Sequence, residues 1–257
     1  MTFFGTIGEG LMTLQGVVFL AADTARSSAY AQAMVNSGLK PQATLLFGMG
    51  SKARLGQAEQ LARSPEIKGV FTPALGVPLR EVCEKFGTTV QDLSAQSISD
   101  QSIRDRLTEL QPKLVIYSGF GGELVPGDLC KNWKFLHLHS GYLPEYRGST
   151  TCYYSLLAEN RCGVSAIYLS PDIDTGDIVA KEHYAPPTRE IDIDYIYDSA
   201  IRADLLVKVL KNYAASDGNL KTVEQDDTEG QTFYVIHPVL KNIAIEHVKS
   251  GEVKSAT

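Results

Sequence analysis

The sequence predicts an α/β fold: a Rossmann-like, doubly wound, mostly parallel sheet followed by a small C-terminal extension. Short apolar runs alternate with helical patterns of ten or more residues over most of the chain. The runs are short and apolar throughout, as in strands that are buried on both faces of a parallel sheet. Turn and cap residues stand between the two kinds of segment. Together these observations indicate repeated strand–helix units around one core.

The strands are expected where apolar residues run together, in places followed by a glycine-rich turn. The first run, 16–22, suits a buried parallel strand, and the run 114–117 leads into a glycine-rich corner at 118–122. The expected strands, in chain order, cover residues 16–22, 43–47, 70–72, 114–117, 134–139 and 163–169.

The helices are expected where apolar residues recur every three or four positions and cap residues stand at the ends. Thr24 or Asp23 can cap the first helix, and Gly38 can end it. Asp100 can cap the last helix of the series, which Pro112 ends. The expected helices cover residues 24–37, 51–63, 78–86 and 101–110.

The pattern changes after Pro186 and Pro187. One long amphipathic helix is expected from Ile193 to about Tyr213, then a polar stretch at 216–231 and a last element at 233–248. We therefore divide the chain into a Rossmann-like domain, residues 1–189, and a C-terminal extension, residues 190–257.

Composition excludes several classes of protein. Hydrophobic residues make up 44% and charged residues 21%, which is ordinary for a globular chain. The net charge is -6 and no basic run appears, so nucleic acid is not an expected partner. No segment is long and apolar enough for a membrane span, and no basic residue precedes the apolar start. The four cysteines show no CxxC spacing, which favours free thiols and the cytoplasm.

Ligands of doubly wound sheets bind beyond the carboxyl ends of the strands, so the chemistry is expected near Gly119 and His139. No GxGxxG follows the first strand, so a dinucleotide is not implied. Strand alternation places His137 and His139 on one face. Two interpretations of this pair are open: an HxH metal site with Asp174 as third ligand, or an aromatic face with incidental histidines.

The segment that follows carries a more specific signal. Its motifs are His139, then Leu143-Pro144 and Tyr146-Arg147-Gly148, then a strand that begins Gly163-Val164, and Asp174 before Gly176. From Leu114 to Val179 this order resembles the folate-dependent formyltransferases, whose pattern is Asn-x-His, Leu-Pro-x-Tyr-x-Gly and Asp-x-Gly-x-Ile. The chain departs from that pattern at His137, which stands where the family has asparagine.

The resemblance implies an enzyme that transfers a formyl group from N10-formyltetrahydrofolate to an amine. His139 and Asp174 would be catalytic, with the carboxylate holding the imidazole protonated. The N–H of His137, neutral or charged, would stabilise the oxyanion in place of the family's amide. The residues implied to contact folate are Phe120, Gly121, Gly122, Glu123, Leu124, Val125, Ile173, Thr175 and Gly176.

Two further residues are implied to contact the acceptor. Tyr142 offers a ring on which a sugar or base can stack. Arg147 can bind an anionic part of the acceptor or form an ion pair with Glu145 or Asp177; both interpretations are open.

The acceptor is expected to be a small amine. The tRNA-directed members of the family carry a larger basic C-terminal domain, and by elimination on length the acceptor is expected to be a nucleotide-linked amino sugar. No metal is expected for this function, and the apolar segment 233–245 suggests a possible homodimer. Two alternatives remain: a metal-dependent hydrolase built on His137, His139 and Asp174, and a non-catalytic relative of the family.

Overall fold

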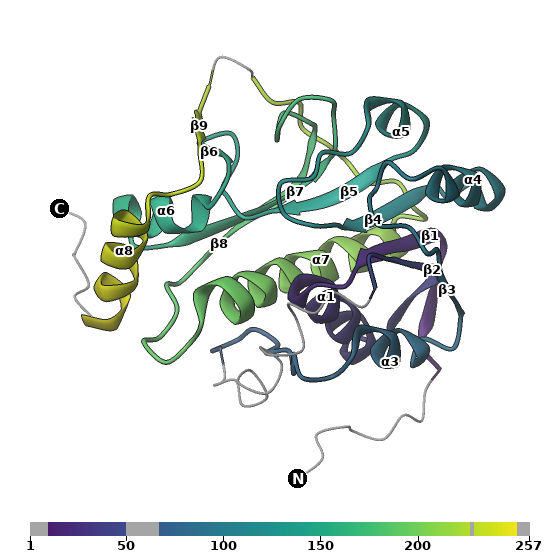
Figure 1. Cartoon of the computed structure of the whole chain (residues 1–257), viewed down its shortest axis with the longest axis horizontal. Coiled ribbons are helices and arrows are strands. Elements are labelled where there is room, and N and C mark those ends of the chain that lie inside the picture. Colours follow the sequence, from purple (N-terminus) through teal and green to yellow (C-terminus); the bar gives the residue numbers. More distant parts are fainter. Residues whose placement is uncertain (1–9, 50–66, 227–228, 251–257) are drawn as a thin grey trace, which may run out of the picture.

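The protein is described by a computed structural model that covers residues 10–49, 67–226 and 229–250. Its centre is a seven-stranded sheet in the order β3-β2-β1-β4-β5-β7-β8 (Figure 1). Strands β1 to β5 pair in parallel, and β7 and β8 add an antiparallel edge. The predicted α/β, mostly parallel fold is confirmed. The strands are β1 Met12–Ala22, β2 Leu39–Phe47, β3 Thr89–Asp92, β4 Leu114–Ser118, β5 Phe135–His139, β7 Cys162–Tyr168 and β8 Ile178–Tyr184.

A second, two-stranded sheet joins the loop after β5 to the C-terminal segment. Its strands β6 (Tyr146–Gly148) and β9 (Gln231–Phe233) pair in parallel. The described helices are α1 Ala25–Asn36, α3 Leu79–Glu84, α4 Gln101–Leu110, α5 Gly127–Asn132, α6 Thr151–Glu159, α7 Asp198–Ala215 and α8 Pro238–Ser250, with a π-helical turn η1, Ile193–Tyr197, before α7. None of these helices is long and apolar enough to cross a membrane.

Helices cover both faces of the large sheet, and strand β1 is accordingly apolar and buried without interruption from Val17 to Ala22. Val17, Phe19 and Ala21 belong to the core cluster that includes residues of α1 and α7. Their neighbours along the strand belong to a second cluster, with Ile103 and Leu107 of α4. Alternate residues of a strand point to opposite faces, so each face receives its own set of apolar side chains. Figure 1 shows α1 and α7 on one side of the sheet and α4 on the other.

Two predicted helix caps are confirmed. The side chain of Thr24 accepts a hydrogen bond from the N–H of Ser27 at the start of α1. Asp100 accepts one from the N–H of Ser102 at the start of α4. These bonds satisfy N–H groups that have no partner within the first helical turn. The helix predicted over 51–63 lies outside the described residues.

One predicted strand is wrong. Residues 70–72 form no strand of the sheet, because Val70 makes only an isolated bridge to Ile67. The third parallel strand is instead Thr89–Asp92, which pairs with β2. This strand lies at the edge of the sheet and is only partly buried, so its sequence contains no apolar run. A pattern based on buried strands cannot detect it.

The predicted long helix after residue 190 is confirmed as η1 and α7. Helix α7 contacts α1 and strands β5, β7 and β8. Its side chains Ile201, Leu206 and Leu210 are completely buried in the main core. The domain division at residue 190 stays a prediction, and the helix just beyond it shares the core of the large sheet.

Candidate active site

The candidate site lies where the strand order of the sheet changes direction. The chain leaves β1 and β4 for helices on opposite faces, and the ends of these strands are tied together by side chains. The hydroxyl of Ser27, in the first turn of α1, lies 2.8 Å from the hydroxyl of Ser118 at the end of β4. In open α/β sheets ligands bind at this point, beyond the carboxyl ends of the strands, and we call this side of the sheet the ligand edge. Strand β5, which carries the two histidines, is the next strand along.

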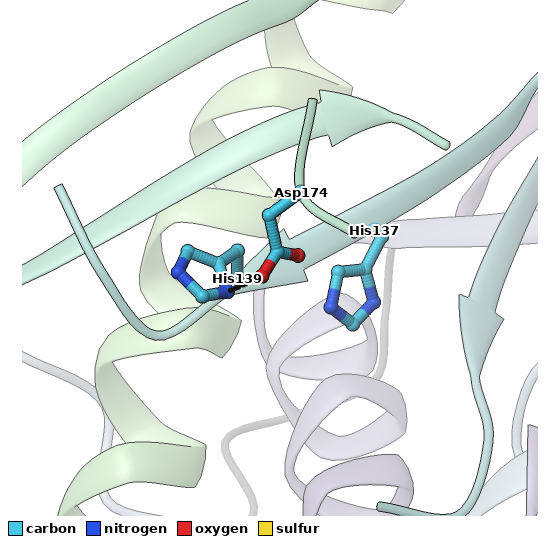
Figure 2. Close-up of side chains that lie close together, drawn as sticks. All are labelled: His137, His139 and Asp174. Atoms are coloured by element: carbon cyan, nitrogen blue, oxygen red, sulfur yellow. Dashed lines mark ion pairs between the residues drawn. The ribbon is translucent and has the colours of Figure 1, made fainter. Parts of the chain in front are cut away.

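The three predicted catalytic residues lie together at this edge. His137 and His139 project from β5, and Asp174 reaches them from the loop before β8 (Figure 2). Nδ1 of His139 lies 3.3 Å from Oδ2 of Asp174. One side-chain nitrogen or oxygen from each of the three residues lies within 4.8 Å of the other two. The structure therefore brings together the two imidazoles and the carboxylate that the sequence analysis predicted.

Backbone contacts fix the orientation of His139 and Asp174. Nε2 of His139 lies 2.7 Å from the carbonyl oxygen of Tyr146, which can only accept a hydrogen bond, so Nε2 carries the proton. Nδ1 then faces the carboxylate. Oδ2 of Asp174 also accepts a hydrogen bond of 2.8 Å from the N–H of Gly148. The side-chain amide of Gln225 donates to the carbonyl oxygen of Asp174, whose backbone is left-handed at φ +55°.

Two opposing effects act on the pKa of His139, which Asp174 was expected to keep protonated. Burial lowers the pKa of His139, and the attraction of Asp174 opposes that effect without overcoming it. The side chain of His139 is only 6% exposed, so removal of its charged form from water is the larger effect. The net effect is a pKa below the usual value, which favours the neutral imidazole with a lone pair on Nδ1.

His137 is also neutral at neutral pH. Burial lowers its pKa well below the usual value, and the positive charges of Arg26 and Arg202 lower it further. Of the two forms considered for its oxyanion role, the structure therefore favours the neutral imidazole. Its Nδ1 is buried and has no hydrogen-bond partner among the described residues.

The two arginines that face this site were not predicted. Arg26 donates to the carbonyl oxygen of Gly119, across the change of strand direction. Its position just after the first strand is a signal that could have been used, since that turn lies at the ligand edge. Arg202 of α7 donates to the carbonyl oxygen of Leu138, 2.9 Å away, and pairs with Asp198 at 2.9 Å. Nothing local in the sequence indicates that Arg202 supports β5.

The first segment predicted to contact folate forms an open turn with apolar sides. Leu124 is 61% exposed, and the ring of Phe120 meets Phe47 edge to face at 5.9 Å. Glu123 is anchored, because its Oε1 accepts a hydrogen bond of 2.9 Å from the N–H of Ile98. Its Oε2 is buried and has no partner among the described residues. Gly121 and Gly122 form the turn itself, and Val125 is buried. The folate contacts of these residues stay a prediction.

The second predicted folate segment lies in the Asp174 loop. Ile173 is 51% exposed, while the hydroxyl of Thr175 lies 2.8 Å from that of Ser170. Gly176 permits a close approach of two backbone segments, because a Cβ atom there would lie 1.7 Å from the carbonyl oxygen of Tyr168. The backbone of this loop is therefore closely packed, while the side chain of Ile173 stays exposed. Folate contacts at these three positions also stay a prediction.

The two predicted acceptor contacts are already engaged within the protein. Tyr142 stacks on the ring of His183 at 3.8 Å, and the ammonium of Lys181 lies 4.1 Å from its centroid. An imidazole and an ammonium at these distances cannot share one face, so both faces of Tyr142 are covered. Stacking of a base on this ring is not available in this conformation, which leaves its edge and hydroxyl for the predicted contact.

Arg147 is buried and points toward the C-terminal segment. Its guanidinium donates to the carbonyl oxygens of Glu229 and Asp226, at 2.9 and 3.1 Å. Within the described part of the chain, Arg147 forms no ion pair with Glu145 or Asp177; its third contact is with Oε1 of Gln225. Contact of Arg147 with an acceptor stays a prediction.

Comparisons with known proteins identify the family of this chain. The family model described as formyl transferase matches residues 17–197. A methionyl-tRNA formyltransferase from Lactiplantibacillus plantarum is 29% identical over 180 residues, which cover 68% of this chain and 54% of that protein. The chain thus spans about half the length of the curated relatives it matches.

Two solved structures illustrate the shared fold. A sugar N-formyltransferase from a Shewanella species has a TM-score of 0.54 at 14% identity, over 93% of this chain and 91% of that chain. HypX from Aquifex aeolicus in complex with tetrahydrofolic acid has a TM-score of 0.50 at 15% identity, over 92% of this chain and 34% of that chain. At these identities the structures show likeness of fold alone. The match to the family model covers well over half of the chain, and the chain belongs to the formyl transferase family.

Proposed function

We propose that the protein is an N-formyltransferase that moves the formyl group of N10-formyltetrahydrofolate to the amine of a small acceptor. The observation that carries this proposal is the contact of His139 with Asp174 beside His137 at the ligand edge of the sheet. Membership of the formyl transferase family supports the reaction, and the bound tetrahydrofolic acid of HypX supports the donor.

The proposed chemistry assigns one task to each of the three residues. The amine nitrogen attacks the formyl carbon, and the neutral N–H of His137 donates to the oxygen as its negative charge develops. The proton lost by the amine moves to Nδ1 of His139, directly or through one water. Asp174, 3.3 Å from that nitrogen, stabilises the imidazolium that forms. The bond from the carbon to N10 then breaks, and the proton passes to N10 as tetrahydrofolate leaves.

The folate is proposed to lie between the two exposed apolar side chains Leu124 and Ile173. A flat, largely apolar ring system would cover surface that these side chains otherwise expose to water. Oε2 of Glu123 has no hydrogen-bond partner in the described part of the chain and can accept a hydrogen bond from an N–H group of the ring.

The acceptor is proposed to be an amino sugar linked to a nucleotide. The chain carries a net charge of -6 without a basic run, which disfavours an acceptor as large and acidic as tRNA. The curated relatives are methionyl-tRNA formyltransferases, so tRNA is the competing acceptor that an experiment must include. The cytoplasmic location expected from the free thiols belongs to this proposal.

The direct test supplies N10-formyltetrahydrofolate together with a panel of nucleotide-linked amino sugars, simple amines and methionyl-tRNA. Release of tetrahydrofolate and the mass of the acceptor are followed together. An acceptor that gains the mass of one formyl group supports the transferase. Folate release with no acceptor present would instead indicate a hydrolase, and no release with any acceptor would contradict the proposal.

A further inference from the structure

We propose that His137, His139 and Asp174 also form a binding site for one divalent transition-metal ion such as zinc. The site would supply two imidazole nitrogens and one carboxylate oxygen, and would leave at least one coordination position open. This proposal goes beyond formyl transfer and does not rest on it. A bound ion would occupy Nδ1 of His139 and Oδ2 of Asp174, so metal binding and the proposed proton transfer exclude each other in one molecule.

The separation of His139 and Asp174 suits two ligands of one ion. Zinc binds imidazole nitrogen and carboxylate oxygen at about 2.0 to 2.2 Å, so two such ligands in a tetrahedral site lie about 3.4 Å apart. Nδ1 of His139 and Oδ2 of Asp174 are 3.3 Å apart. With Nε2 of His139 donating to a carbonyl, both of these atoms present lone pairs to the same point.

Contacts behind the ligands have the form found around metal sites. Metal-binding histidines usually donate their second ring N–H to a backbone carbonyl or a carboxylate, and ligating carboxylates are themselves hydrogen-bonded. His139 makes the first contact, to Tyr146, at 2.7 Å. Asp174 makes the second, to the N–H of Gly148, at 2.8 Å. Both ligands are therefore held in place by the backbone of strand β6.

His137 is the residue that turns this pair into a three-ligand site. An imidazole is a good ligand for zinc, whereas the asparagine found here in the family pattern is not a usual one. The ligand atoms of the three residues lie within 4.8 Å of one another, so His137 must close on the other two by a side-chain rotation. Among the residues that the structure describes, none forms a hydrogen bond with its buried Nδ1 that such a rotation would break.

The donor set and its surroundings select the kind of ion. Two nitrogens and one oxygen favour zinc, iron or cobalt over magnesium and calcium, which prefer oxygen ligands alone. The charges of Asp174 and Asp198 are balanced by those of Arg26 and Arg202, so the imidazoles and not a net negative charge must provide the affinity.

The test uses the full chain after treatment with a chelator and its removal. Zinc chloride is titrated in by calorimetry, and cobalt chloride is titrated while visible absorption is followed. We expect one ion per chain and cobalt bands typical of a site with nitrogen ligands. His137→Asn and Asp174→Asn should each weaken zinc binding at least tenfold. His183→Asn is the matched control, because His183 also lies on a strand of the large sheet, β8, but outside the cluster.

Thermal unfolding in the presence of chelator checks that each variant is folded. If His137→Asn does not fold, Asp174→Asn still tests the site. Absence of stoichiometric zinc binding by the wild-type chain would overturn the proposal. So would zinc binding that neither variant weakens. Formyl transfer is assayed separately on the metal-free chain: transfer without zinc binding contradicts only the metal site, and zinc binding without transfer contradicts only the proposed function.

Discussion

Nδ1 of His139 faces Oδ2 of Asp174 at 3.3 Å, while Nε2 of the same ring contacts the carbonyl oxygen of Tyr146. The imidazole is thus held at both ring nitrogens, and burial lowers its pKa in spite of the adjacent carboxylate. This arrangement prepares Nδ1 to accept a proton and Asp174 to stabilise the resulting charge.

Loss of the Asp174 charge should slow formyl transfer. In Asp174→Asn the imidazolium formed during the reaction loses its partner, and we expect kcat to fall by about 10²- to 10³-fold. KM for the folate donor should change much less. Asp172→Asn removes an exposed carboxylate from the same loop and is the control. Equal kcat values in the two variants would contradict the role of Asp174.

Stability should fall as pH is lowered below about 6.5, the usual pKa of an unfolded histidine. Burial lowers the pKa values of both His137 and His139, so between the folded and unfolded values the unfolded state binds more protons. The free energy of unfolding then decreases with falling pH, by at most about 1.4 kcal/mol per pH unit for each histidine.

Urea unfolding of the wild type and His137→Asn at pH 7.5, 6 and 5, with chelator present, measures this slope. The variant lacks one of the two buried imidazoles, so its free energy of unfolding should depend less steeply on pH. Identical slopes would show that His137 does not titrate differently in the folded and unfolded states.

Arg202 should act as a positioning residue for strand β5. Arg202→Met removes the hydrogen bond to Leu138 and leaves Asp198 without its ion-pair partner, with only 18% of its side chain exposed. We expect a loss of about 3 kcal/mol in the free energy of unfolding. Because strand β5, which carries the two histidines, would shift, kcat should also fall. KM for the folate donor should stay unchanged.

Lys208→Met is the control for Arg202, since Lys208 lies on the same helix and pairs with Glu182 and Asp204 at the surface. An exposed pair of this kind contributes about 1 kcal/mol or less. If the two variants lost equal stability and kept equal kcat, Arg202 would have no special relation to the site.

Glu123→Gln should weaken binding of the folate donor. The substitution keeps an oxygen that accepts the hydrogen bond from the N–H of Ile98. It replaces Oε2, which has no partner among the described residues, by an NH₂ group, and it removes the negative charge of the side chain. A charge-assisted hydrogen bond contributes about 1.5 to 3 kcal/mol, so KM for the donor should rise roughly 10- to 100-fold. Glu84→Gln, an exposed carboxylate of α3, should leave KM unchanged. An unchanged KM in Glu123→Gln would place the folate elsewhere.

The large sheet and much of the site could be predicted from the sequence because the signals are local. Apolar runs mark the buried strands β1, β4 and β5, Thr24 and Asp100 mark helix starts, and period-two alternation places His137 and His139 on one face. The edge strand β3 was not predicted, because it is only partly buried and its sequence therefore contains no run of apolar residues.

The sequence by itself determined which residues meet at the site: two histidines on β5 and an aspartate in a following loop. Only the tertiary structure decided their protonation, because the pKa of His139 depends on burial by the whole fold and not on its neighbour Asp174 alone. It also decided which distant groups surround them. Arg26 and Arg202 come from helices 176 positions apart in the chain (202 − 26), and only packing of α1 against α7 brings both to His137.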